Sequence, residues 1–484
     1  PLGKPLGLRR KVGSYKWTRD FEHATVTLDL NSPLEGSSIV FHSAGASAYK
    51  PWAHSWDTAG SAWWGDFGYS LLTTSQAAFV ADNYFLASLE KCTGESNGIH
   101  SEHGIYRTAK QLKAINPDVK TAFYWHVSQA GIRCYAALSE LQAHPEWHLK
   151  DDNGNVVGPP EEPCIDWTIK EAADWWVSVP LRGYKGTSPA EARQVIDGVL
   201  ADGAGFATFP HISPIRLNIL HDAKLAMLQQ LQQAFDSVGR GGVVFGNGLT
   251  EYANTTPTDD PFNRRILSYV RGVLHEHYAA FEQVLPDGSL DLQKVSDALD
   301  NIEWASLSVD KSTSGWCEGC KQVFCSFWAG PYTGFSTGPG PAAGWPRYYD
   351  DSQPCGSNSA EGVSCTLAQL HQGWKRELQK WLPFNLASFL SVAQSNTWFT
   401  QAVWYSDAQG FFPCPNHPDT CDAPRHFYED YLKMPLGKPL GLRKKIGRYK
   451  WTREFEHATV TLDLNSPLEG TSIVFHSAGT SLLL

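Results

Sequence analysis

Short apolar runs alternate with longer stretches of helical periodicity along the middle of the chain. The helical stretches predict five helices, at Ile105–Ile115, Ile169–Val179, Ala223–Phe235, Leu292–Ala305 and Gln369–Ala393. The apolar runs predict eight strands, at Phe85–Glu90, Thr121–His126, Cys164–Trp167, Gly198–Gly203, Gly242–Gly248, Gly272–Tyr278, Gln322–Gly330 and Trp398–Tyr405. This alternation is typical of an α/β fold with a parallel sheet. Eight strands close a (β/α)8 TIM barrel, although a doubly wound open sheet gives a similar pattern.

The two ends of the chain carry the same segment. Residues 1–47 return at 435–481 with six differences, Arg10/Lys444, Val12/Ile446, Ser14/Arg448, Asp20/Glu454, Ser37/Thr471 and Ala46/Thr480. Alternating positions in His23–Leu30 and a short run at Ser38–His42 predict two strands of a small antiparallel β appendage. Such an element is marginal alone and must pack on something larger.

A long repeat of this kind indicates a tandem array of whole domains. We therefore expect residues 48–434 to form the barrel and 435–484 to be the β segment that packs on it. Residues 1–47 are then the end of a preceding repeat unit, or a duplicated flank, with neighbouring repeat units as partners. The pattern leaves open which copy packs on this barrel.

Composition narrows the class of protein. Hydrophobic residues make up 42% and charged residues 19%, which suits a large folded core. The net charge of −10 indicates no binding to nucleic acid. No apolar run of 18 residues predicts a membrane span. The chain has no Walker A, Gly-x-Gly-x-x-Gly or Gly-x-Ser-x-Gly motif, so no cofactor is expected and serine hydrolysis is not indicated.

The ten cysteines fall mostly in local clusters, at Cys317, Cys320 and Cys325, at Cys355 and Cys365, and at Cys414 and Cys421. Together with a glycosylation sequon at Asn254, they favour disulfides and a secreted or cell-surface glycoprotein. A zinc site at Cys317 and Cys320 is the alternative, but no second such pair accompanies it. No metal is therefore expected.

Polar or aromatic residues stand near the end of nearly every predicted strand. They are Glu90, His126, Asp166, Asp202, Asn247, Glu276, Trp328 and Tyr405. In a TIM barrel the active site lies at the carboxyl ends of the strands, so these side chains are expected to converge. One carboxylate at a strand end is commonly a structural cap, whereas four on separate strands favour a site.

Cleavage of a glycosidic bond needs two carboxyl groups, one on each side of the bond. Asp202 and Glu276 follow the fourth and sixth predicted strands, so they can face each other across the barrel. We assign Asp202 as the nucleophile and Glu276 as the acid/base. His275 and His277 flank Glu276 and can tune its pKa.

Other residues are candidates for binding the sugar. Glu90, Asp166 and His126 are alternatives for orienting hydroxyl groups or exchanging catalytic roles. Asn247 offers an amide between two glycines, although the run is also a simple turn. Aromatic rings stack on the apolar faces of sugars, and core packing is the other explanation of such rings. The aromatic candidates are Trp125, Trp328, Tyr332, Trp404 and Tyr405.

Three stretches, 88–94, 123–125 and 196–203, resemble glycoside-hydrolase-like barrels allied to the α-galactosidase superfamily. The closing stretch 451–460 is similar to the segment that follows those barrels. The resemblance covers roughly residues 80–475. It implies a nucleophilic aspartate at the end of strand four and an acid/base carboxylate on strand six, the places that Asp202 and Glu276 occupy.

Three functions fit these features. The first is a retaining glycosidase acting on an extracellular or cell-wall polysaccharide or oligosaccharide. The second is a non-catalytic tandem-repeat protein with a structural or carbohydrate-binding role. The third, a metal-dependent hydrolase using His126, Asp166 and Asp202, lacks any His-x-x-x-His zinc motif. The pair Asp202 and Glu276 favours the first.

Overall fold

The computed structural model describes most of the chain. The described residues are 10–13, 15–21, 24–31, 38–41, 52–65, 70–128, 133–183, 188–237, 242–249, 265–280, 283–285, 287–308, 321–332, 367–402, 433, 435–477 and 480–483.

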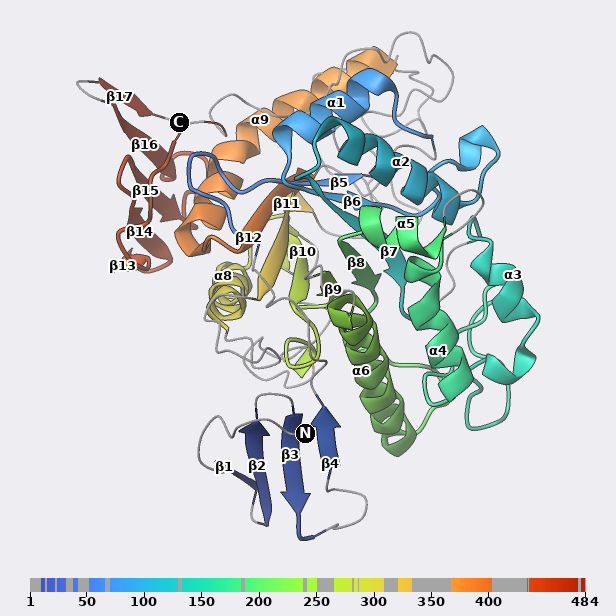
Figure 1. The fold of residues 1–484 in the computed structure, drawn as a ribbon. Helices are drawn as coiled ribbons and strands as arrows, with labels where there is room; N and C mark the ends of the chain where they lie inside the picture. The colour runs from blue at the N-terminus through green and yellow to red at the C-terminus, as the bar shows by residue number, and fades with distance from the viewer. Residues whose placement is uncertain are drawn as a thin grey trace.

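An eight-stranded parallel sheet forms the centre of the molecule (Figure 1). Its strands, in spatial order and in chain order alike, are β5 (Ala62–Gly65), β6 (Leu86–Leu89), β7 (Lys120–His126), β8 (Gly198–Asp202), β9 (Val243–Asn247), β10 (Gly272–Ala280), β11 (Gln322–Tyr332) and β12 (Thr397–Ala402). A parallel bridge between Ser61 and Phe399 joins the last strand to the first. The sheet is therefore a TIM barrel, as the strand count predicts.

Helices cover the outside of the sheet (Figure 1). They are α1 (Thr74–Asn83), α2 (Ser101–Ile115), α3 (Ala137–Gln142), α4 (Lys170–Ser178), α5 (Pro189–Val195), α6 (Pro214–Ser237), α8 (Leu292–Leu307) and α9 (Leu367–Val392), with short 3-10 turns at Glu95–Asn97, Pro145–Trp147 and Val179–Leu181. All five predicted helices are present; four have small shifts at their ends, whereas α6 starts nine residues before the predicted Ala223. Among the described residues, no helix is both long and apolar enough to cross a membrane.

Strand alternation sorts the core into two layers. Side chains facing the barrel axis form an inner cluster, for example Ala122 and Tyr124 on β7 and Leu200 on β8. The intervening positions, such as Phe123 and Val199, pack outward against the helices. Because side chains of a strand alternate between its faces, this parity also decides which residues at the strand ends can reach the site.

One of the eight predicted strands is wrong. Cys164–Trp167 is not part of the barrel: Ile165 makes only an isolated antiparallel bridge to His148, in the long connection between β7 and β8. The missing strand is β5, at the start of the barrel, where the run Ala62–Gly65 is only four residues long. The total stays at eight because the extra strand and the missing strand offset each other.

Each copy of the repeated segment forms an antiparallel sheet. The first contains β1 (Arg10–Gly13), β2 (Lys16–Phe21), β3 (Ala24–Asp29) and β4 (Ser38–Phe41). The second contains β13 (Lys444–Gly447), β14 (Lys450–Glu454), β15 (Ala458–Asp463), β16 (Ser472–Ser477) and β17 (Thr480–Leu483). The sequence pattern predicted only two strands for each copy. The second copy packs on α9 through β14, β15 and β16 (Figure 1).

Candidate active site

Inward-facing side chains from six neighbouring strands meet at the carboxyl end of the barrel. Trp64 lies on β5, Glu90 follows β6, and Tyr124 lies on β7. Asp202 ends β8, Asn247 ends β9 and Glu276 lies on β10. Each of the six has the parity of the inner cluster on its strand, so alternation directs all of them toward the barrel axis. This is the end of a TIM barrel at which active sites lie.

Asn247 connects the two candidate catalytic carboxylates. Its Nδ2 atom donates a hydrogen bond of 2.8 Å to Oδ1 of Asp202 and another of 2.6 Å to Oε2 of Glu276. The strand order explains the contact, because β9 lies between β8 and β10. The two oxygens are therefore no more than about 5.4 Å apart, the two hydrogen-bond lengths end to end.

Several groups stabilise the charged form of Asp202. Burial by itself raises the pKa of this carboxyl group, but the opposing interactions outweigh burial and lower it. These are the charges of His126 and Lys91 and hydrogen bonds from Tyr124 and Asn247. The backbone N–H of Gly203 donates a further hydrogen bond of 2.9 Å to Oδ1. Asp202 is thus an ionised carboxylate at neutral pH, as a nucleophile must be.

A second polar cluster borders Asp202 on the side of β5 and β6. The indole N–H of Trp64 donates a hydrogen bond to Oε1 of Glu90, and Lys91 Nζ lies 3.6 Å from Oε2 of the same carboxylate. Lys91 also lies 4.7 Å from the centre of the Tyr124 ring. The hydroxyl of Tyr124 donates to Oδ2 of Asp202, and burial raises the pKa of this phenol well above its usual value. Tyr124 therefore stays protonated and remains a donor.

The two histidines beside Glu276 differ in position. Nε2 of His277 lies 3.7 Å from Oε1 of Glu276. His275 is completely buried, pairs in register with Cys325 on β11, and neither of its ring nitrogens has a hydrogen-bond partner. Burial lowers the pKa of both rings to about 3. Both are neutral at physiological pH, and His277 is the one that contacts the site.

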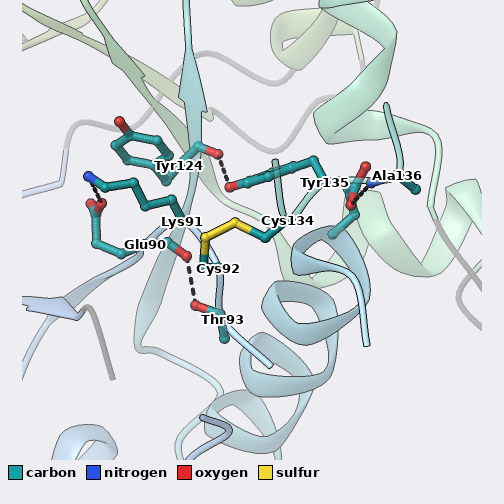
Figure 2. The surroundings of a disulfide bond; sticks show 9 residues. Glu90, Lys91, Cys92, Thr93, Tyr124, Cys134, Tyr135 and Ala136 are labelled. Carbon is teal, nitrogen blue, oxygen red and sulfur yellow. Dashed lines mark hydrogen bonds and ion pairs between the residues drawn. A yellow bond between two sulfur atoms is a disulfide. The ribbon is translucent and has the colours of Figure 1, made fainter. Parts of the chain in front are cut away.

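A disulfide holds the loop that carries Glu90 and Lys91 (Figure 2). Cys92 on this loop is bonded to Cys134, in the loop after β7, 42 residues further along the chain. The next residue, Tyr135, donates a hydrogen bond of 2.8 Å to the backbone carbonyl of Tyr124. The bridge therefore fixes the second polar cluster against the strand that presents Tyr124.

The turn after Asp202 is held from beneath by a buried lysine. Lys224 on α6 is fully buried, and its Nζ donates to the carbonyl of Gly205 and lies 3.4 Å from that of Gly203. Gly203 has a φ of +70°, and a Cβ there would lie 3.1 Å from the His126 ring. A glycine is therefore favoured in this turn. His126 lies beside Asp202 because the two residues pair in register between β7 and β8.

Besides His275, two more of the predicted site residues lie elsewhere. Trp125 has the opposite parity to Tyr124 and is fully buried against the helices, where its N–H donates to the carbonyl of Trp176. Asp166 does not end a barrel strand: its carboxylate accepts hydrogen bonds from the amide and hydroxyl of Thr168 in a turn. We therefore exclude both from the candidate site. Trp404 and Tyr405, and the side chains of Trp328 and Tyr332, lie outside the described residues.

Three residues of the site were missed. Trp64 was missed because β5 was not predicted. Tyr124 was passed over for Trp125, although period-two alternation places Tyr124 on the same face as the strand-end His126. Lys91 carried no separate signal beyond its place next to Glu90.

Most of the cysteine clusters, and Asn254 of the sequon, also fall outside the described residues. In the part of the chain that the structure describes, Cys325 and Cys164 are buried free thiols. One described group of potential metal ligands, Cys92, Glu95 and Cys134, is close enough to share an ion, but its two sulfurs are bonded to each other.

The barrel and its paired carboxylates define a protein of the glycoside-hydrolase type. The model of a family described as "Hypothetical glycosyl hydrolase family 15" matches residues 113–459. Because this match covers more than half of the chain, the chain belongs to that family. The matched region contains Tyr124, Asp202, Asn247 and Glu276. A search of curated protein sequences gave no match.

Several solved structures are similar at low identity. An α-amylase from Geobacillus thermoleovorans is 11% identical with a TM-score of 0.41, and the alignment covers 90% of this chain and 97% of that one. A cyclic α-maltosyl-(1→6)-maltose hydrolase from Arthrobacter globiformis is 8% identical with a TM-score of 0.41, covering 90% and 94%. The galactosidase domain of an α-galactosidase–sucrose kinase is 9% identical with a TM-score of 0.35, covering 84% and 44%.

Proposed function

We propose that this protein is a retaining glycoside hydrolase with Asp202 as nucleophile and Glu276 as acid/base. The observation that carries the proposal is the shared amide of Asn247, which brings the two carboxylates within about 5.4 Å of each other. Retaining glycosidases hold their carboxyl groups about 5–5.5 Å apart, whereas inverting enzymes leave about 6.5–9.5 Å for a water molecule. The short separation supports direct attack by Asp202.

The environments of the two carboxylates suit different roles. In the first step, a carboxylate oxygen of Asp202 attacks the anomeric carbon and the bond to the leaving oxygen breaks. Glu276, as the acid, gives its proton to that oxygen. Asp202 is kept charged by His126, Lys91 and Tyr124, as this step requires. Because Oε2 of Glu276 accepts the hydrogen bond of Asn247, we assign the proton to Oε1, which lies 3.7 Å from Nε2 of His277.

In the second step, a water molecule replaces the leaving group. Glu276 takes a proton from the water, the water oxygen bonds to the anomeric carbon, and the ester bond to Asp202 breaks. Asp202 leaves as a carboxylate and again accepts the hydrogen bonds of Tyr124 and Asn247. Trp64, Glu90 and Lys91 border the same site and supply a ring, an acceptor and a donor for sugar hydroxyls.

We propose an extracellular or cell-wall polysaccharide or oligosaccharide as the substrate. The Cys92–Cys134 disulfide supports an oxidising compartment. The likeness to the α-galactosidase superfamily is part of this proposal, because the nucleophile and the acid/base occupy the fourth and sixth barrel strands as they do there. The sequon at Asn254 is consistent with a secreted glycoprotein.

The proposal is tested with aryl glycosides and a panel of glycans. Asp202→Asn and Glu276→Gln should each abolish hydrolysis, and Asp202→Ala should regain turnover with azide and yield a glycosyl azide. For the unchanged protein, NMR of the first product should show the anomeric configuration of the substrate. Asp118→Asn, an exposed aspartate on the protein surface, is the matched control and should keep full activity.

Two results would reject the proposal. Inversion of the anomeric configuration would exclude the covalent step on Asp202. Glycan binding that survives both substitutions, with no hydrolysis by the unchanged protein, would favour the non-catalytic carbohydrate-binding role that the repeated segment also suits.

A further inference from the structure

The two copies of the repeated segment fold in the same way. Trp17 pairs with Leu28 in the first sheet, and Trp451 pairs with Leu462 in the second. The same ion pair closes each hairpin, Lys16 with Asp29 at 3.3 Å and Lys450 with Asp463 at 2.9 Å. The two sheets therefore present the same residues on the same faces.

The second copy uses one face to bind the barrel. Leu462 and Leu464 are 0% and 1% exposed in the core shared with α9. Nη1 of Arg453 donates hydrogen bonds of 2.9 and 2.6 Å to the carbonyls of Leu390 and Ala393 at the end of α9. We call this the docking face.

Contacts at its margin reach α8 and the start of the barrel. Arg443 pairs with Asp300 and Glu303 on α8, and the Tyr449 hydroxyl bonds to Gln293. The ring of Phe455 lies 5.5 Å from that of Trp56. The barrel surface that receives the docking face is thus formed by α8, α9 and the chain around Trp56.

Two leucines on the same face of the first copy are exposed. Leu28 and Leu30, the counterparts of Leu462 and Leu464, are 45% and 53% exposed. In Figure 1 the sheet β1–β4 stands away from α9, whereas β13–β17 lies beside it. The two exposed leucines of the first copy therefore lack the burial against a helix that stabilises the second copy.

Of the six differences between the copies, the five whose side chains the structure describes lie away from the docking face. Lys444, Ile446, Arg448 and Glu454 are all exposed in the docked copy. Thr471 accepts a hydrogen bond from the backbone of Asp463 inside the sheet, and the side chain of Thr480 lies outside the described residues. Arg443, Tyr449, Trp451, Arg453, Phe455, Leu462 and Leu464 are all identical in the first copy. The first copy therefore keeps the chemistry that binds a barrel.

We propose that the first sheet, β1–β4, is a docking module for the α8–α9 surface of a second copy of this barrel. It binds there as β13–β17 binds in its own chain, with Arg19 capping α9 and Leu28 and Leu30 buried. Because the donor sheet and the acceptor surface are different parts of the chain, the contact is head-to-tail and can propagate along an array. In the full chain the acceptor surface is already covered, so a second copy binds only where its own following segment is displaced.

The test mixes two full-length chains. The acceptor carries Leu462→Glu and Leu464→Glu, which displace its second sheet, and Leu28→Glu and Leu30→Glu, which disable its first. The donor is the unchanged chain. Sedimentation velocity should show a two-chain species in the mixture and single chains in each component alone.

Donor variants show whether the docking face makes the contact. A donor with Leu28→Glu and Leu30→Glu should form no complex. A donor with Val12→Glu should form it unchanged, because the matching Ile446 is exposed in the docked copy. A second acceptor carries Arg453→Ala in place of Leu462→Glu and Leu464→Glu, and keeps Leu28→Glu and Leu30→Glu. Arg453→Ala removes the hydrogen bonds to α9 without burying a charge. The proposal is overturned if neither acceptor captures the donor, or if the Leu28→Glu, Leu30→Glu donor binds as well as the unchanged chain.

Discussion

Asp202 and Glu276 accept hydrogen bonds from one nitrogen, Nδ2 of Asn247, although the two carboxylates are 74 positions apart in the sequence. The relationship depends on strand order, because Asn247 ends the strand between theirs. A single amide thus sets the distance between the two carboxylates and supplies both with a donor. Its Oδ1 atom is buried and has no hydrogen-bond partner in the structure, which leaves an acceptor for a substrate hydroxyl.

Replacing this amide by a carboxylate should disable the site with little change in shape. In Asn247→Asp, two donors are lost and a negative charge enters between the carboxylate of Asp202 and the carboxyl group of Glu276. Like charges disfavour ionisation, so the pKa of Asp202 should rise and the acid limb of kcat/KM should move up by about one pH unit or more. The maximal kcat/KM should fall at least about 100-fold. Asn153→Asp, on the surface, is the control, and an unshifted pH profile in Asn247→Asp would contradict the assignment.

Tyr124 should contribute to the rate through its hydroxyl alone. Tyr124→Phe removes the hydrogen bond to Asp202 and should raise the pKa of that carboxyl group. A hydrogen bond to a charged group is worth about 1.5–3 kcal/mol, so kcat/KM should fall about 10- to 100-fold. Tyr106→Phe provides the comparison, because its hydroxyl binds the carbonyl of Val179 on the helix side of the fold. Equal losses of activity in both variants would show that Tyr124 acts only through stability.

The Cys92–Cys134 disulfide should support both stability and activity. It closes a loop of 42 residues, for which the chain-entropy relation gives about 4 kcal/mol. Cys92→Ala with Cys134→Ala should lower the free energy of unfolding by up to about that amount, and should lower activity by loosening Glu90 and Lys91. Urea denaturation with and without a reductant measures this. Reductant should weaken the unchanged chain more than the double variant. Cys164→Ala, which removes a free thiol, should lose as much stability with reductant as the unchanged chain.

Stability should fall on mild acidification because neutral histidines are buried. Burial lowers the pKa of His275 to about 3, against about 6.5 for an exposed ring. Between these two values the unfolded chain binds the proton and the folded chain does not. The free energy of unfolding is therefore full above about pH 6.5 and falls as the pH drops toward 3, by about 1.4 kcal/mol per pH unit for each such ring.

The variant His275→Leu tests the effect of a buried histidine on stability without changing a catalytic residue. His275 faces away from the carboxylates and lacks hydrogen-bond partners, so an apolar side chain of similar size should fit. Denaturation midpoints over a pH series should show a slope smaller by about one proton. His457→Leu, at an exposed position, should leave the slope unchanged, and an unaltered slope in His275→Leu would count against the burial argument.

The barrel and its two central carboxylates could be predicted because they depend on local patterns. Apolar runs and helical periodicity repeat often enough to give the strand order, and Asp202 and Glu276 directly follow such runs. The predicted positions of Asp202 and Glu276, on the fourth and sixth strands, were right although two errors in the strand prediction cancelled each other. The false strand at Cys164–Trp167 took the place of the missed strand Ala62–Gly65, so the fourth and sixth positions were unchanged.

What could not be predicted depends on contacts distant in the sequence. Asp166 resembles a strand-end carboxylate, and only its partners in space show that it closes a turn. The pairing of Cys92 with Cys134 follows from the proximity of two loops and not from cysteine spacing. The prediction that Trp125 binds the sugar was wrong for a different reason, because the alternation of side chains along β7 already assigns Trp125 to the outer face.

The Arg453 contact with α9 has a consequence for the order of folding. Helix α9 ends at Val392, and a guanidinium more than 50 residues further along satisfies carbonyl groups at that end. During synthesis from the amino terminus, the barrel thus emerges with the end of α9 uncapped and an apolar surface exposed. The barrel is completed only when residues 435–477 leave the ribosome, so this domain finishes folding after the last strand of the barrel has been synthesised.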